Sequence, residues 1–144
     1  MRPVVVLAYH ATDVWRTQPD LRRSLTAHVE NSSDHRAFDV RVSDLALDDR
    51  TRLTFAPIAT LSPWEHARLI ANGSDLSLTQ HISRFVVRHA LTGAPHVRAW
   101  PLRIVYRDAA GARFVTCWEI RVLSMPLEIG AVAVECASDE SPEA

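Results

Sequence analysis

The chain has no lysine, and all 16 of its basic residues are arginine. A high-GC coding sequence would produce this bias without a functional reason, whereas retention of arginine for planar ion pairs would be a functional one. The 17 acidic residues leave a net charge of −1, and neither sign forms a long run. The sequence therefore lacks the basic stretches that favour DNA, RNA or anionic lipid, and we predict no nucleic-acid partner.

Cysteine and glycine are also scarce. The two cysteines, Cys117 and Cys136, are too few for a disulfide framework and lack the spacing of metal ligands. We expect Cys117 to be a small residue beneath a covering element; a reactive thiol activated by Arg113 and Arg121 is the alternative. Four glycines in the whole chain exclude a glycine-rich loop that cradles phosphate.

Long apolar runs are missing as well. The apolar run near the N-terminus covers only residues 4–8, which is too short for a signal peptide or a membrane span. We therefore predict no membrane span in this chain and a cytoplasmic location, or an extracytoplasmic one if a native leader precedes Met1. The hydrophobic content of 47% is that of an ordinary globular domain. We predict one domain over residues 1–137 and a disordered acidic tail at 138–144.

Strand patterns dominate the first part of the chain. Residues 4–9 are apolar and β-branched, as in a buried strand. Residues 25–29 and 38–42 alternate between apolar and polar, which predicts strands with one face in a core. In the second of these strands Phe38, Val40 and Val42 are expected to point inward. Residues 11–23 are predicted to form a loop, and further short strands are expected near residues 53–55, 67–71 and 131–135.

The strongest pattern is a hairpin near the C-terminus. Residues 102–107 and 113–121 alternate with period two, and Asp108-Ala109-Ala110-Gly111 between them is typical of a tight turn. Trp118 is expected to lie on the inward face. Residues 77–91 instead carry apolar side chains at helical spacing, which predicts one amphipathic helix. The sum is an all-β, mainly antiparallel fold with one helical insert, since a parallel α/β fold would need several crossover helices.

Three stretches resemble a known type of module. They are LTAHVENSSDHRAFDVRV (residues 25–42), APIATLSPWEHARL (56–69) and LRIVYRDAAGARFVTCWEI (102–120), the last with a Tyr-x-Asp-x-x-Gly hairpin. Together they are similar to bacterial immunoglobulin-like and fibronectin-like β-sandwich modules. This resemblance implies an immunoglobulin-like sandwich that serves as an adhesive, spacer or accessory domain, and it implies no catalytic residues.

Residues that would carry catalysis or bind metal do not converge in the sequence. The seven histidines form neither an HxH nor an HExxH arrangement, and Asp44, Asp48 and Asp49 lack the glycine and closing glutamate of a calcium loop. A Gly-x-Ser-x-Gly nucleophile motif is also missing. We therefore predict no metal, no cofactor and no enzymatic activity.

Two surfaces are candidates for binding. One face of the predicted hairpin combines arginine with aliphatic residues, a composition typical of interfaces: Arg103, Val105, Arg107, Arg113, Val115 and Arg121. Either the helix covers this face, or the face is open and binds another protein chain, which could be a second copy of this one; we favour the second arrangement. The alternative function is small-ligand or carbohydrate binding through tryptophans expected in loops: Trp15, Trp64 and Trp100.

Overall fold

The computed structural model describes residues 2–11, 25–74, 76, 78–92, 99–124 and 128–136. The predicted loop at 11–23, apart from residue 11, and the predicted tail at 138–144 lie outside these residues. Ten strands and one helix follow one another in the described part of the chain: β1 (Val5–Ala11), β2 (Leu25–Asn31), β3 (Ala37–Val42), β4 (Leu45–Ala46), β5 (Arg52–Leu53), β6 (Ile58–Leu61), β7 (His66–Arg68), α2 (Leu78–Thr92), β8 (Ala99–Arg107), β9 (Arg113–Ser124) and β10 (Glu128–Val134).

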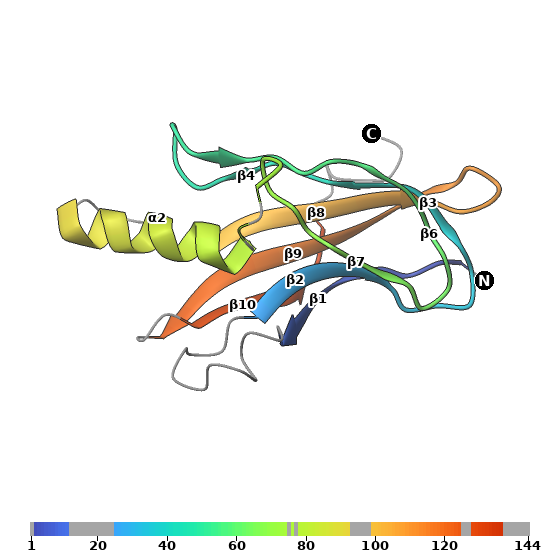
Figure 1. Ribbon diagram of the computed structural model, residues 1–144. Coiled ribbons are helices and arrows are strands. Elements are labelled where there is room, and N and C mark those ends of the chain that lie inside the picture. Colours follow the sequence, from blue (N-terminus) through green and yellow to red (C-terminus); the bar gives the residue numbers. More distant parts are fainter. Residues whose placement is uncertain are drawn as a thin grey trace.

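The strands form two main sheets, and every pairing between them is antiparallel. The three-stranded sheet has the order β1-β2-β7, and the five-stranded sheet has the order β10-β9-β8-β3-β6. The short strands β4 and β5 pair with each other beside them (Figure 1). The fold is therefore all-β and mainly antiparallel with one helix, as the sequence predicts.

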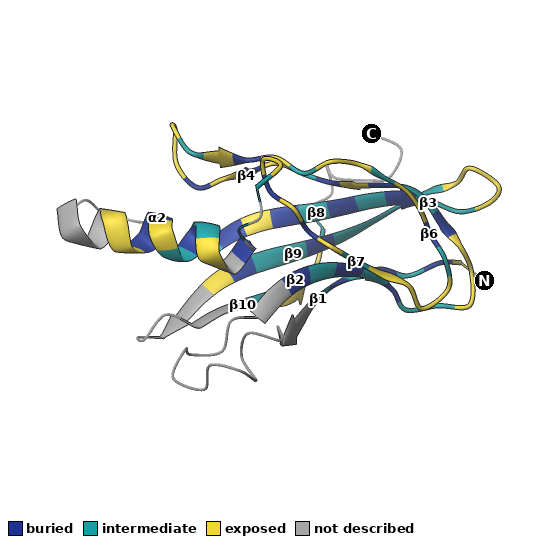
Figure 2. Ribbon diagram, in the orientation of Figure 1, coloured by how far each residue is buried: buried dark blue, intermediate teal, exposed yellow. Residues whose placement is uncertain are grey.

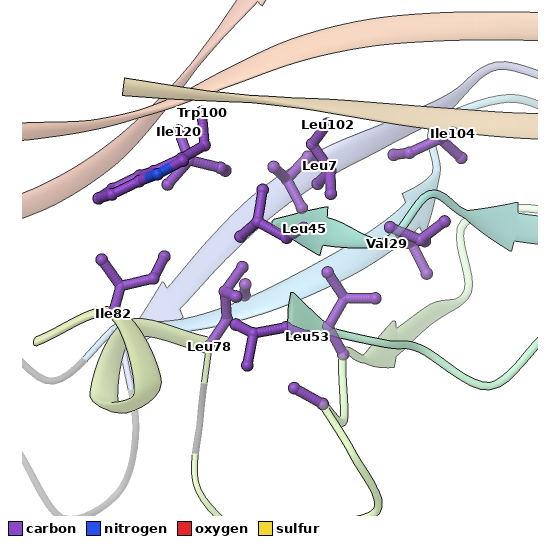
Figure 3. Packing of buried hydrophobic residues seen from close by; sticks show 14 of the residues in the cluster. Leu7, Val29, Leu45, Leu53, Leu78, Ile82, Trp100, Leu102, Ile104 and Ile120 are labelled. Carbon is purple, nitrogen blue, oxygen red and sulfur yellow. The ribbon is translucent and has the colours of Figure 1, made fainter. Parts of the chain in front are cut away.

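The hydrophobic core lies between the two sheets. Val29 of β2 and Leu102 and Ile104 of β8 are each at most 1% exposed, and they belong to one buried cluster. Leu45 and Leu53, from the short strands, fill the space between them (Figure 3). Because the residues between these buried positions point outward, each sheet presents one face to the core and one away from it.

Helix α2 closes one end of this core. Its buried side chains Leu78, Ile82, Phe85 and Val86 follow helical spacing, so a single stripe faces inward (Figure 2). The Phe85 ring meets Trp100 edge-on at 6.0 Å between ring centroids. The predicted helix at 77–91 is thus confirmed to within one residue. It packs at the core side of the five-stranded sheet and contributes its apolar stripe there.

The β8–β9 hairpin forms where the sequence predicts it. Tyr106 pairs with Phe114 and Arg107 with Arg113, and the turn between them is closed by a hydrogen bond from the Gly111 N–H to the Asp108 carbonyl (3.0 Å). Gly111 has φ +86°, a conformation that favours glycine. Trp118 lies on the core side as predicted, although it is only partly buried.

A bulge in β3 moves Phe38 away from its predicted place. Ala37 and Val40 both point into the core, although they are three residues apart, because Asp39 is an extra residue with φ +50°. Phe38 pairs with Arg107 and so shares the side of the sheet that faces away from the core. The expectation that Phe38 points inward with Val40 and Val42 is therefore wrong.

Asn31 is a fully buried polar residue that joins both sheets. Its Nδ2 donates to the carbonyls of His35 (2.7 Å) and Leu61 (3.0 Å), and its Oδ1 accepts from the Ser33 hydroxyl (2.7 Å). The Asn31 backbone also bonds to the residues just before β7. Its N–H donates to the Glu65 carbonyl, and its carbonyl accepts from the Trp64 N–H. The turn after β2 is thus fixed from inside the molecule by the Asn31 side chain.

Candidate interaction face

We call the side of the five-stranded sheet that points away from the core the outer face. Residues directly opposite each other in a sheet share a face. The register pairs Arg103 with Cys117, Val105 with Val115, Arg107 with Arg113, and Ala99 with Arg121. All six residues predicted for the partner surface therefore lie on the outer face.

The outer face mixes half-buried aliphatic side chains with arginines. Val105 and Val115 are half-buried side by side at its centre. Asp39, at the bulge, binds two arginines, Arg41 at 2.9 Å and Arg107 at 3.8 Å. These groups are about half exposed, so the pairs organise the side chains more than they stabilise the fold.

Two residues of β3 also belong to the outer face, and the sequence pattern places Arg41 there but not Phe38. Phe38 arrives there through the β3 bulge, and Arg41 pairs with Val105 across β3 and β8. The period-two pattern gave no sign of the bulge; the only local signal is Asp39, because aspartate tolerates positive φ better than most residues. The face therefore carries an aromatic side chain beside its two central valines.

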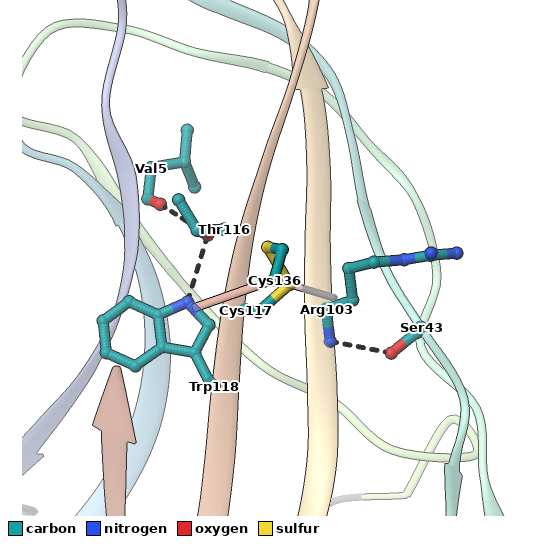
Figure 4. The surroundings of a disulfide bond; sticks show 7 residues. All are labelled: Val5, Ser43, Arg103, Thr116, Cys117, Trp118 and Cys136. Atoms are coloured by element: carbon teal, nitrogen blue, oxygen red, sulfur yellow. Dashed lines mark hydrogen bonds between the residues drawn. A yellow bond between two sulfur atoms is a disulfide. The ribbon is translucent and has the colours of Figure 1, made fainter. Parts of the chain in front are cut away.

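A disulfide bond sits on the outer face between Cys117 and Cys136, with 5.3 Å between their Cα atoms. Figure 4 shows it on the same side of the sheet as Arg103 of β8, while Thr116 and Trp118 of β9 point to the opposite side. Cys117 is buried, as expected for a covered residue, but the bond corrects the expectation of a free cysteine and excludes the reactive thiol. The physical reason is the antiparallel return of β10: Val134 pairs with Cys117, which brings Cys136 back beside it.

Next to the disulfide the surface is hollowed. The hollow has a volume of about 380 Å³ and is open to one side. Its lining includes two carboxylates and one guanidinium, from Asp44, Glu135 and Arg103. The backbone of Arg103 is fixed by two bonds to Ser43, while its guanidinium forms no ion pair with any residue the structure describes.

Comparison with known proteins identifies no relative. No family model, no curated protein and no solved structure matches the chain. The function is therefore inferred from the outer face alone.

The two candidate tryptophans that the structure describes, Trp64 and Trp100, differ in their surroundings. Trp100 is part of β8 and 3% exposed, and its Nε1 donates to the Leu47 carbonyl at 3.1 Å. The prediction that Trp100 lies in a loop is wrong. The neighbouring Pro101 does not end β8, because the pairing of β3 with β8 stops before Pro101 and no β3 residue needs its missing N–H. Trp64 is 63% exposed, in a turn with φ +64°. Trp15 lies outside the described residues.

Two titratable residues among those described have shifted pKa values. Burial lowers the pKa of His81, and the nearby Arg84 lowers it further; the His81 Nε2 has no hydrogen-bond partner among the residues that the structure describes. Burial raises the pKa of Tyr106 more than the Val5 backbone and Arg2 lower it. Over the described ranges, no three His, Cys, Asp or Glu residues lie together as a metal site would need. No helix among the described residues is long and apolar enough to cross a membrane.

Proposed function

We propose that this chain is a non-enzymatic interaction domain, acting as a scaffold, accessory subunit or self-assembly module, whose outer face binds another protein chain. The observation that carries the proposal is the pair Val105 and Val115, aliphatic side chains set among arginines on a sheet face away from the core. Aliphatic, aromatic and arginine side chains together are enriched at interfaces, whereas a solvated strand face carries more Thr, Ser and Glu. The partner surface would offer apolar groups with carboxylates around them.

The placement of the helix supports an open face. The buried stripe of α2 belongs to the core cluster, and its aromatic contact is with Trp100, on the core side of β8. Val105 and Val115 point to the other side of the sheet. Of the two arrangements considered for the hairpin face, these contacts therefore favour the open face over a face covered by α2.

We also propose that the fold is an immunoglobulin-like sandwich, as the resemblance implies. In such domains the first, second, fourth and fifth strands form one sheet, and the third, sixth and seventh form the other. Here β1, β2 and β7 form one sheet and β3, β8 and β9 neighbour one another in the second, with β6 beside β3. The disulfide departs from antibody domains, where the bond joins the two sheets.

The disulfide also bears on the location of the protein. The sequence favours the cytoplasm, with an extracytoplasmic site as the alternative. Disulfide bonds persist mainly in oxidising compartments. The Cys117–Cys136 bond thus supports the extracytoplasmic alternative, which we propose here.

The test of the interaction role is Val115→Arg. An added guanidinium on an open face should leave the melting temperature close to that of the wild type while abolishing recovery of the partner, or self-association. Val87→Arg is the matched control, because Val87 is 48% exposed on α2, away from the outer face. Retention of every interaction by Val115→Arg would reject the outer face, and a large loss of stability would show that another element covers it.

Ligand binding by loop tryptophans remains the second candidate, with Trp64 alone to support it. Its indole is held by a hydrogen bond from Nε1 to Asp34 (3.0 Å), so the exposed ring is fixed in one orientation. A bulky residue at positive φ is strained, and such strain is often found at functional sites. Quenching of the tryptophan fluorescence of the chain by soluble sugars would favour this candidate if the quenching disappears in Trp64→Gly.

A further inference from the structure

The two ends of the Cys117–Cys136 bond differ in their exposure to solvent. Cys117 is 7% exposed, whereas Cys136, the last residue that the structure describes, is half-buried. The bond lies on the outer face, and in the described part of the chain Cys117 is not among the residues of the buried cluster between the sheets. The accessibility of a disulfide sulfur helps to decide which end a thiol attacks, so an incoming thiol should meet Cys136 first.

The hollow beside the bond has room for a small molecule. Its volume of about 380 Å³ lies within the range of small-ligand pockets, roughly 300–1,000 Å³. Cys117 lines the hollow, as does Glu135, the residue before Cys136. A low-molecular-weight thiol that enters the hollow is therefore brought next to the disulfide.

The charges around the hollow are divided between the two ends of the bond. Glu135 is exposed and adjoins Cys136, so a carboxylate lies at the end that a thiol attacks. Arg103 pairs with Cys117 in the β8–β9 register, so a cation lies at the end that leaves, where positive charge favours a thiolate. Because a carboxylate disfavours an approaching anion, the rest of the attacking molecule should be neutral or carry an amine.

β10 does not depend on the disulfide alone for its place in the sheet. It pairs with β9 from Ile129 to Val134, and it also lies beside β1 and α2. Its bulge, between Glu128 and Ile129, is at the opposite end of the strand from Cys136. Opening of the bond should therefore release the chain at Cys136 and leave the sheet folded.

We infer that the Cys117–Cys136 bond is a site of thiol–disulfide exchange with a low-molecular-weight thiol that is neutral or carries an amine. The thiol loses its proton to solvent, and its sulfur forms a bond to Sγ of Cys136. The bond between the two cysteines breaks, and its electron pair goes to Sγ of Cys117, which leaves as a thiolate and takes up a proton. One disulfide replaces another, so no further oxidant or reductant is needed. The inference goes beyond the interaction role and does not depend on what binds the outer face.

Exchange with cysteamine, a small thiol that carries an amine, tests the inference on the folded, oxidised full chain. After a short incubation the free thiols are trapped by alkylation, and peptide mapping by mass spectrometry locates the products. We expect cysteamine bound to Cys136 through a disulfide and the alkylating group on Cys117. The circular dichroism spectrum should stay that of the folded chain.

The charge of the thiol gives a second readout. The rates with cysteamine and with the anionic 2-mercaptoethanesulfonate are each divided by the rate of the same thiol with a small neutral disulfide. We expect these normalised rates to favour cysteamine several-fold, and Glu135→Gln to reduce the preference. Glu65→Gln, at an exposed glutamate in the turn before β7, is the matched control and should retain the preference.

Four results would overturn the inference. Adducts on Cys117 rather than Cys136 would contradict the assigned point of attack, and adducts that form only in urea would show that the folded chain protects the bond. Equal normalised rates for the two thiols, or a preference that survives Glu135→Gln, would contradict the assigned class of thiol. In each case the proposed interaction role stands or falls separately, because Val115→Arg tests it without involving the disulfide.

Discussion

At the scale of single residues, Asn31 shows how the two sheets are held in place by one polar side chain. Its amide supplies both of its donors to carbonyls and its oxygen accepts from a hydroxyl, all inside a fully buried site. A buried polar group is tolerated only when it is bonded in this way. The turn chemistry of Asn-Ser-Ser-Asp is visible in the sequence, but the partner at Leu61, 30 residues away, is not.

Asn31→Ala should therefore destabilise the fold. The substitution leaves the buried Leu61 carbonyl without the donor it has in the wild type, at a cost of about 1–3 kcal/mol. Urea denaturation followed by circular dichroism measures the free energy of unfolding. Thr60→Ala, an exposed position one residue from Leu61, should change it by less than about 0.5 kcal/mol. Equal stabilities for the two variants would contradict the assigned role of Asn31.

Phe38 marks the limit of what the sequence could predict at this scale. Its alternation with Val40 and Val42 is regular, and period two correctly places both valines in the core. The bulge at Asp39 then reverses the side for Phe38 alone. A bulge leaves one residue of the strand unpaired, and its position depends on the packing of the whole sheet. The local alternation therefore does not predict it.

At the scale of elements, the sequence predicts hairpins better than it predicts pairings. The β8–β9 hairpin follows from a local turn and two alternating arms, and the structure confirms the turn and both arms. The β9–β10 register could not be predicted, because β10 is apolar on both faces and a slip of one residue would expose little that is polar. The Cys117–Cys136 bond depends on that register, which is why the disulfide was missed.

Reduction of the disulfide should lower the stability of the chain. The bond closes a loop with a sequence separation of 19 residues. For a loop of this size the entropy of the unfolded chain accounts for about 3 kcal/mol. Thermal melts of the wild type with and without reductant, and of the double variant Cys117→Ser/Cys136→Ser, measure this effect. The double variant should melt like the reduced wild type and ignore reductant; two free thiols in the unreduced protein would contradict the bond itself.

At the scale of the whole molecule, the two faces of the five-stranded sheet have different roles. One face packs with the three-stranded sheet and with α2, which together enclose a core of apolar side chains. The other face carries the arginines, the central valines, Phe38 and the disulfide, and the apolar edge of β10 continues it. The alternation in the sequence predicted this division, while the position of α2 on the core side of the five-stranded sheet required the structure.

The most direct test of an open, partner-binding outer face is site-specific photo-crosslinking. A benzophenone amino acid is introduced in place of Val105, at the centre of the outer face, and in a second variant in place of Val87 on α2. Each variant is irradiated in the native host, and the adducts are identified by mass spectrometry. We predict a discrete adduct from position 105, with this chain or another protein, and none from position 87. Adducts from position 87 only, or from neither position, would contradict the assignment of the outer face as the binding surface.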